Sequence, residues 1–191
     1  MSNPRERLEH EQVYQPAEDS QLLATTVTDR ISPTDRVLEI GTGSGYVASQ
    51  IVEKTGATVV ATDINPHACR SAADKQIEVV RTDIADAIKG QFDVVVCNPP
   101  YLPTDPDDEF DDWMEYALSG GPDGRALVNP LLEELPRLLT DDGRAYLLVS
   151  TLTGIDAITE RAAEFDLLVE TIAEEPVPFE TLTVLKITQK H

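Results

Sequence analysis

Residues 37–45 of the chain read Val37-Leu-Glu39-Ile-Gly41-Thr-Gly43-Ser-Gly45. A short apolar run comes first, and glycines then occupy every second position. A strand that ends in such a turn, directly before a helix, is typical of parallel α/β sheets. Glycines permit a positive φ and let the backbone approach a ligand closely. The dinucleotide fingerprint Gly-x-Gly-x-x-Gly is not matched, because the third glycine comes too early. A structural tight turn is the alternative.

Short apolar runs and amphipathic stretches alternate on both sides of this turn. They predict strands at 36–40, 58–61, 77–80, 92–97, 144–150, 167–173 and 181–188, and helices at 17–30, 44–54, 66–75, 128–139 and 154–165. Such alternation predicts an α/β fold with a seven-stranded, mostly parallel, doubly wound sheet. No helix separates the last two strands, so we expect an antiparallel last strand or a hairpin at one edge. One domain, 13–191, would follow a flexible N-terminal arm, 1–12.

The chain of 191 residues is strongly acidic, with 35 Asp and Glu against 15 Lys and Arg and a net charge of −20. The acids are spread along the sequence. This predicts a halophilic protein, because salt screens the repulsion between surface charges. The same charge opposes binding to a nucleic-acid backbone. No apolar run reaches the roughly 20 residues that span a bilayer, and the first residues do not form a secretory signal. We therefore expect a cytoplasmic protein.

The cysteines and histidines give no sign of a metal site. Cys69 and Cys97 are far apart and form no Cys-x-x-Cys pair, and the three histidines are scattered. We expect two buried free thiols, no disulfide and no bound metal.

Three acidic residues near strand ends predict the ligand. Glu39, two residues before Gly41, would repel a pyrophosphate but suits a cation, such as the sulfonium and amino groups of S-adenosylmethionine. Asp63 ends the second predicted strand, where a carboxylate can accept hydrogen bonds from ribose hydroxyls. Asp83 follows the third strand and could accept from an adenine amino group. Alternatively, Asp63 and Asp83 only cap helices.

The fourth predicted strand runs into Asn98-Pro99-Pro100-Tyr101. A planar NH2 nitrogen is a poor nucleophile and needs to be held in line with the methyl donor. The Asn98 side-chain oxygen and the Pro99 carbonyl can accept its two N–H groups, and the two prolines hold this backbone extended. Tyr101 offers a ring face for stacking. The sequence therefore predicts methylation of a planar NH2 group, with a proline-rich strand terminator as the alternative.

Together these residues resemble class I, Rossmann-like methyltransferases, and in particular the HemK-like release-factor glutamine methyltransferases of archaea and eukaryotes (the catalytic subunit). The resemblance covers nearly all of residues 13–188. The matching segments are Val13-Tyr-Gln-Pro-Ala-Glu-Asp-Ser20, Leu38-Glu-Ile-Gly-Thr-Gly-Ser-Gly45, Ala61-Thr-Asp-Ile-Asn-Pro66, Asn98-Pro-Pro-Tyr101, Gly120-Gly-Pro-Asp-Gly-Arg125 and Glu180-Thr-Leu-Thr-Val-Leu-Lys186. The chain departs from the family at 174–179, where a small, glycine-containing turn is usual.

The resemblance implies an S-adenosylmethionine-dependent protein-(glutamine-N5) methyltransferase acting on the Gly-Gly-Gln loop of a class 1 peptide-chain release factor in translation termination. It also implies a heterodimer with a small zinc-ribbon activator protein at the edge of the third strand, 77–80. Residues implied to line the cofactor pocket are Ser20, Glu39, Gly41, Asp63, Asp83 with Ile84, and Asn98, to which the turn itself adds Gly43 and Gly45.

Two other functions remain open. An amino-methyltransferase acting on adenine or cytosine of DNA or RNA would use the same Asn98 motif on a flipped base, but would need a basic face. A binding scaffold without activity would be expected to lose the glycine turn or Asn98, and both are present. The acidic segment 105–112 reads as a solvated loop, and Trp113 after it as part of a lid over the substrate.

Overall fold

The computed structural model describes residues 12–104 and 113–191. The predicted arm at 1–12, apart from its last residue, and the acidic segment 105–112 lie outside these ranges. The strands are β1 (Arg36–Ile40), β2 (Thr58–Asp63), β3 (Glu78–Arg81), β4 (Phe92–Cys97), β5 (Leu139–Ser150), β6 (Leu167–Val177) and β7 (Glu180–Gln189). The helices are α2 (Glu18–Thr28), α3 (Tyr46–Thr55), α4 (Pro66–Asp74), α5 (Trp113–Tyr116), α6 (Val128–Leu138) and α7 (Ile155–Ala163), with a 3₁₀ turn η2 (Thr151–Thr153).

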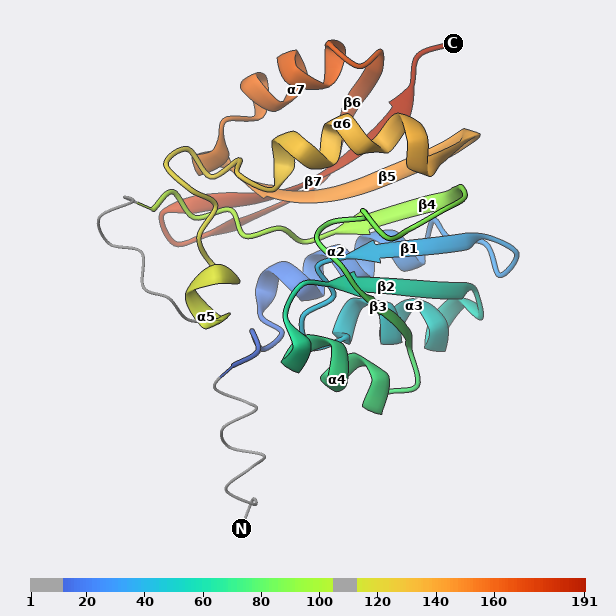
Figure 1. The fold of residues 1–191 in the computed structure, drawn as a ribbon. Coiled ribbons are helices and arrows are strands. Elements are labelled where there is room, and N and C mark those ends of the chain that lie inside the picture. The colour runs from blue at the N-terminus through green and yellow to red at the C-terminus, as the bar shows by residue number, and fades with distance from the viewer. Residues whose placement is uncertain (1–11, 105–112) are drawn as a thin grey trace.

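All seven strands form one sheet, as the sequence predicts, in the order β3-β2-β1-β4-β5-β7-β6. The pairs from β3 to β5 are parallel, whereas β7 is antiparallel to both β5 and β6. The last strand is thus inserted between β5 and β6, and β6 forms the edge (Figure 1). The antiparallel last strand and the terminal hairpin are both confirmed.

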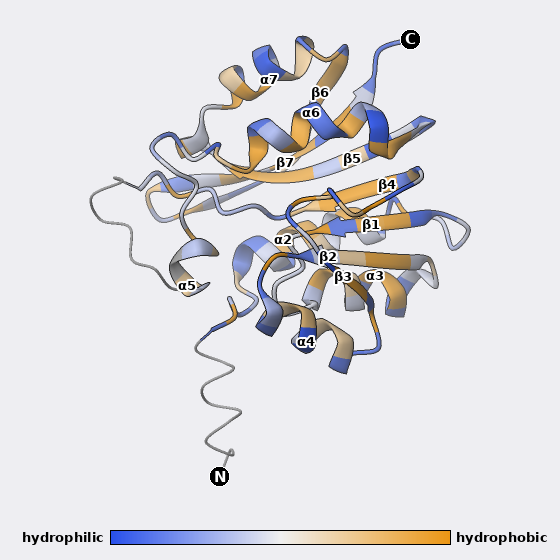
Figure 2. Cartoon of the chain, in the orientation of Figure 1, coloured by the Kyte–Doolittle hydropathy of each residue, from blue (hydrophilic) through white to orange (hydrophobic). Residues whose placement is uncertain are grey.

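Helices cover both faces of the sheet, and each face has its own apolar core. One core packs side chains of α2, α3 and α4 against one face of the sheet, to which β1 contributes Val37. The other core packs α6 and α7 against the opposite face, to which β1 contributes Leu38, the residue that follows Val37. Neighbouring residues of a strand point to opposite faces, so a parallel strand that is covered on both faces is mostly apolar, as the colouring of β4 in Figure 2 shows.

Several boundaries differ from the predictions. The helix expected at 128–139 ends at Leu138, and β5 starts at Leu139 instead of Arg144. Leu139 is fully buried and pairs with Phe92, and the register then shifts before Val94 pairs with Arg144. The polar residues between, which include Asp141 and Asp142, hid this strand from a pattern based on apolar runs.

The thiols were predicted only in part. Both cysteines are free; Cys97 is buried in β4, but Cys69 is only half-buried. The buried face of α4 consists of Ala68 and Ala72, four residues apart, and Cys69 lies beside this stripe. Among residues 12–104 and 113–191, no group of His, Cys, Asp or Glu side chains has the makings of a metal site. No helix in these ranges is long and apolar enough to cross a membrane.

The glycine turn brings α3 close to α4. Gly45 precedes α3 in the left-handed conformation, with φ of 77°. A Cβ atom there would lie 2.8 Å from the Ala72 Cα atom, whereas a Cβ at Gly43, whose φ is 53°, would meet nothing within 4 Å. Both positions require a positive φ, but only Gly45 also requires the absence of a side chain for packing.

This difference predicts unequal effects of two alanine substitutions. We expect Gly43→Ala to lower the free energy of unfolding by about 1 kcal/mol, from backbone strain alone. We expect Gly45→Ala to lower it by about 3 kcal/mol, because the new methyl group also overlaps the backbone of α4. Urea unfolding of the ligand-free protein measures both, and equal losses would contradict the packing role of Gly45.

Candidate active site

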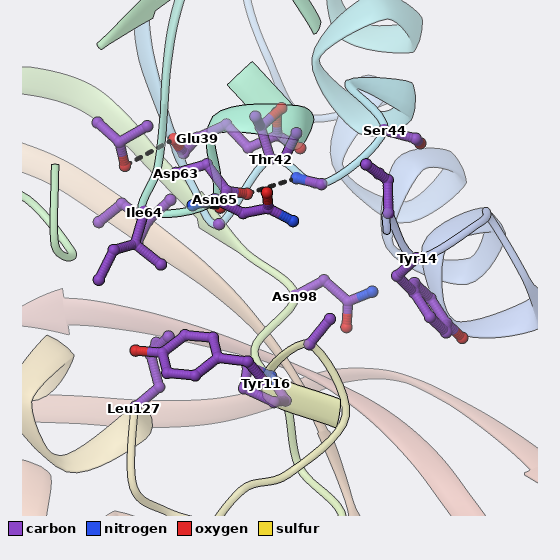
Figure 3. A pocket seen from close by; sticks show the side chains of 18 of the residues that line it. Tyr14, Glu39, Thr42, Ser44, Asp63, Ile64, Asn65, Asn98, Tyr116 and Leu127 are labelled. Atoms are coloured by element: carbon purple, nitrogen blue, oxygen red, sulfur yellow. Dashed lines mark hydrogen bonds between the residues drawn. The ribbon is translucent and has the colours of Figure 1, made fainter. Parts of the chain in front are cut away.

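A cavity opens at the carboxyl ends of β1, β2 and β4 (Figure 3). It combines acidic side chains on one side with apolar walls on the other. Of the predicted site residues, it is lined by Ser20, Glu39, Gly41, Gly43, Asp63, Asp83, Ile84, Asn98 and Pro100. Gly45 is not among the lining residues, which agrees with its contact with α4. The apolar walls come from Val13, Val47, Trp113, Tyr116 and Leu127 among others.

Backbone hydrogen bonds hold the glycine turn against β2. The N–H groups of Gly41 and Thr42 donate to the Thr62 carbonyl at 2.9 and 3.0 Å. The Gly43 N–H donates to Asp63 Oδ2 at 2.8 Å. The floor of the cavity is therefore a turn that three successive N–H groups attach to the end of β2.

Glu39 is a buried carboxylate at the base of the cavity, with an exposed fraction of 4%. Its Oε2 accepts a hydrogen bond from the Thr42 hydroxyl. Burial raises the pKa of Glu39 to about 8, and the nearby Asp63 charge adds to the increase. An ionised Glu39 is thus costly in the empty cavity and would be stabilised by a cationic ligand.

Asp63 is held by its own backbone neighbourhood. Besides Gly43, the Asn65 N–H donates to its Oδ1 at 2.8 Å. Burial raises the pKa of Asp63, while these backbone N–H groups lower it. The cap of α4 is Asn65, whose side-chain oxygen accepts from His67 N. Asp63 therefore supports the turn and does not cap the helix, and each of its oxygens can accept a further hydrogen bond from a ligand in the cavity that it lines.

Asp83 and Ile84 lie at the outer part of the cavity. Asp83 is exposed, and within the described ranges its carboxylate accepts no hydrogen bond. The helix-capping alternative therefore finds no support. Ile84 has a φ of 42°, and its carbonyl accepts from the Thr62 hydroxyl at 2.8 Å. This contact fixes a strained residue at the cavity wall.

A second cavity adjoins the first and holds the rest of the predicted catalytic motif. It is lined by Tyr14, Asp19, Asn98, Pro99, Pro100, Tyr101, Leu102, Ala117, Leu118 and Glu180. Tyr14, Asn98, Pro100 and Ala117 line both cavities, so Asn98 lies where the two meet.

Asn98 presents an unpaired acceptor at this junction. Its Nδ2 donates to Asp19 Oδ2 at 3.0 Å and to Ser20 Oγ at 3.3 Å. Its Oδ1 is buried and has no hydrogen-bond partner in the described structure. A buried acceptor without a partner is unfavourable unless a ligand supplies the donor. The site is thus arranged to receive an N–H group.

Comparison with known proteins agrees with this layout. The Methyltransferase small domain family matches residues 15–109. The chain is 37% identical over 182 residues to "Putative protein N5-glutamine methyltransferase MJ0928" of Methanocaldococcus jannaschii, covering 92% of this chain and 91% of the relative. It is 31% identical to Methyltransferase HEMK2 of Homo sapiens, covering 93% and 90% of the two chains.

The chain belongs to the HemK-like glutamine methyltransferases. Among solved structures, the E. cuniculi Mtq2–Trm112 complex, described as responsible for methylation of the eRF1 termination factor, superposes with a TM-score of 0.77. The sequences are 27% identical, and the match covers 94% of this chain and 99% of that one. The fold and the enzyme class predicted from the sequence are therefore confirmed.

Three side chains of this methyltransferase were missed in the sequence. Tyr14 and Asp19 belong to a matching segment from which only Ser20 was selected, and Glu180 opens the last matching segment. The Glu180 Oε2 atom is buried without a partner in the described ranges and faces the second cavity. Each is separated from Asn98 by about 80 residues, so no local pattern could have indicated that it lines the same cavity. Trp113, predicted as part of a lid, lines the first cavity and packs edge-on against Tyr116.

Burial of Glu39 predicts a dependence of stability on pH. Its pKa rises from an ordinary 4.5 to about 8, so between these values the native state binds a proton that the unfolded state has lost. This contribution to stability therefore falls as pH increases through that window. Glu39→Gln should abolish this fall and make the ligand-free enzyme more stable than wild type by more than about 1 kcal/mol near pH 9. Chemical unfolding at pH 5 and pH 9 tests this; a difference independent of pH would contradict it.

Proposed function

We propose that the enzyme transfers a methyl group from S-adenosylmethionine to the side-chain amide nitrogen of a glutamine in a class 1 release factor, most simply in its Gly-Gly-Gln loop. The observation that carries this proposal is the unpaired Asn98 Oδ1 at the junction of an acidic cavity and a second, adjoining one. A relative from Schizosaccharomyces pombe, 26% identical over 94% of this chain, is named eRF1 methyltransferase catalytic subunit.

The first cavity fits S-adenosylmethionine, which would supply an electrophilic methyl group on a sulfonium. Glu39 offers the negative charge that suits the cationic end of this cofactor. Asp63 offers free lone pairs for ribose hydroxyls, and the exposed Asp83 for an adenine amino group. Ile84, Tyr116 and Leu127 line this cavity and provide apolar surface for a flat ring. A phosphate-bearing cofactor would instead be repelled by the acidic residues.

The second cavity would take the substrate amide. Asn98 Oδ1 accepts one N–H of the amide, and the Pro99 carbonyl accepts the other, so that the nitrogen is directed at the methyl donor. Tyr101 supplies a face for the planar group. Burial and the nearby acids raise the pKa of Tyr101 and raise that of Tyr14 to about 12, so both phenols stay neutral. After transfer, the nitrogen is strongly acidic and loses its proton to water.

The runner-up activity, methylation of adenine or cytosine in a nucleic acid, would use the same acceptors. The net charge of −20 and the acids lining both cavities oppose a phosphate backbone. We assign the excess of acids to solubility in a salt-rich cytoplasm.

The reaction itself gives the decisive test. We expect mass spectrometry of release factor incubated with enzyme, activator and S-adenosylmethionine to show one added methyl group on the loop glutamine. Asn98→Ala should lower kcat by about 100-fold or more, with S-adenosylmethionine affinity changed little, because Asn98 acts on the substrate amide. Near-normal turnover of a folded Asn98→Ala protein would overturn the mechanism. Methylation of a nucleic acid, but not of the release factor, would favour the runner-up.

The proposed partner is a small zinc-ribbon activator protein that binds the edge of β3. Among the described strands, β3 has a neighbour on one side only, and this edge strand carries the half-buried Val79 and Val80. The Thr82 N–H donates to the Asp63 carbonyl of β2. Since amides alternate in direction along a strand, the Val79 N–H points to the open edge. The E. cuniculi relative was solved as a complex with Trm112, which supports a partner of this kind.

A proline at position 79 tests this edge. Val79→Pro removes an outward N–H donor without breaking the hydrogen bonds to β2, so it should weaken binding of the activator by at least about tenfold. Val79→Ala, which keeps the N–H, is the matched control. Titration of the purified chains measures both. Equal binding by the two variants, or a wild-type chain that is monomeric and fully active alone, would contradict the partner proposal.

A further inference from the structure

The orientation of the Asn98 amide decides whether the site can work. An asparagine side chain has an acceptor oxygen and a donor NH2 group of nearly the same shape. If the amide were rotated by half a turn, Nδ2 would point at the substrate NH2 group and donor would meet donor. The junction of the two cavities therefore needs a device that keeps Oδ1 toward the substrate.

We propose that Asp19 is a positioning residue that holds the Asn98 amide in this orientation. An ionised carboxylate can only accept hydrogen bonds, so Asp19 Oδ2, 3.0 Å from Nδ2, excludes the rotated amide. Its negative charge also strengthens the bond it accepts and polarises the amide so that Oδ1 becomes a better acceptor. The inference rests on the proposed function, because it assumes that the acceptor at Oδ1 faces a substrate N–H.

Asp19 is itself held firmly. Its exposed fraction is 4%, and its Oδ1 accepts from the Ser20 N–H at 2.6 Å. Its Oδ2 also accepts from the Tyr14 hydroxyl at 3.3 Å. Asp19 lies in the first turn of α2, where the helix dipole favours a negative charge. The Asp19 carboxylate is thus held in a fixed position beside Asn98.

Ser20 cannot fix the amide by itself. Its hydroxyl donates to Asp19 Oδ1 and accepts from Asn98 Nδ2, both at 3.3 Å. A hydroxyl can rotate to donate elsewhere, so without Asp19 the Ser20 side chain would tolerate either orientation of the Asn98 amide. Glu18, the neighbouring acid in the same helical turn, is exposed and makes no contact with Asn98 among the described residues. It therefore offers a control with the same change in charge.

The first experiment compares Asp19→Asn with Glu18→Gln in the complete enzyme with activator and release factor. Asparagine at position 19 can donate as well as accept, so the orientation of Asn98 is no longer enforced. We expect kcat to fall by about tenfold or more, with KM for S-adenosylmethionine and the melting temperature close to those of Glu18→Gln. Equal kcat values for the two variants would overturn the proposal. If the wild-type enzyme does not methylate the release factor, the proposed function is wrong, which is a separate outcome from equal kcat values of the two variants.

The second experiment exchanges the two groups. Asn98→Asp alone places two carboxylates about 3 Å apart, where both cannot be ionised at once, and we expect low activity at about pH 8. In the double variant Asp19→Asn with Asn98→Asp, the amide now at position 19 donates to one carboxylate oxygen of residue 98. The other carboxylate oxygen of residue 98 remains an acceptor for the substrate N–H. We expect kcat at least about tenfold above either single variant. A double variant no better than the singles would mean that Asp19 has only a structural role, and would overturn the proposal.

Discussion

The parallel pairing of β4 with β1 is the constraint on which the active site depends. After β3 the chain returns to the other side of β1, so that β1 lies between β2 and β4. Ile40 pairs with Thr62 on one side and with Cys97 on the other. The residues that follow, Gly41 and Asn98, therefore leave neighbouring strands at the same level. The connections from these strands lead to opposite faces of the sheet, which opens a crevice between them.

The site concentrates buried acids in a protein that is already strongly acidic. Asp19 and Glu39 are each 4% exposed, and burial raises the pKa of Glu39 and Asp63. The desolvation of the Glu39 and Asp63 carboxylates opposes folding in the absence of ligand. The structure compensates with backbone and hydroxyl donors, such as Gly43 N–H for Asp63 and Thr42 for Glu39. A positively charged cofactor would complete this compensation, so affinity and the instability of the empty site have one physical origin.

Asn98 shows how chemical and structural roles divide among nearby residues. The two prolines that follow Asn98 restrict the backbone and so fix the position of its Cα atom. Asp19 and Ser20, from α2, fix the orientation of its side-chain amide. The two sets of constraints come from segments 79 residues apart in the chain. The same division applies to the cavities. The first is lined by segments after β1, β2, β3 and β4, whereas the second combines the segment after β4 with residues of distant elements, such as Asp19 of α2 and Glu180 at the start of β7.

The sequence by itself determined the α/β class, the seven strands, and the residues at the ends of β1, β2 and β4. Apolar runs, glycine positions and the Asn-Pro-Pro-Tyr motif are local, and a parallel sheet turns such local signals into a shared edge. Only the tertiary structure decided that β7 enters between β5 and β6, that Gly45 serves packing against Ala72, and that Asp19 contacts Asn98. These features depend on pairing and packing between segments far apart in the chain. The hydrophobic periodicity of one segment does not show which distant segment it will contact. The polar start of β5 escaped prediction for the same reason: Leu139 is a strand residue because Phe92 pairs with it.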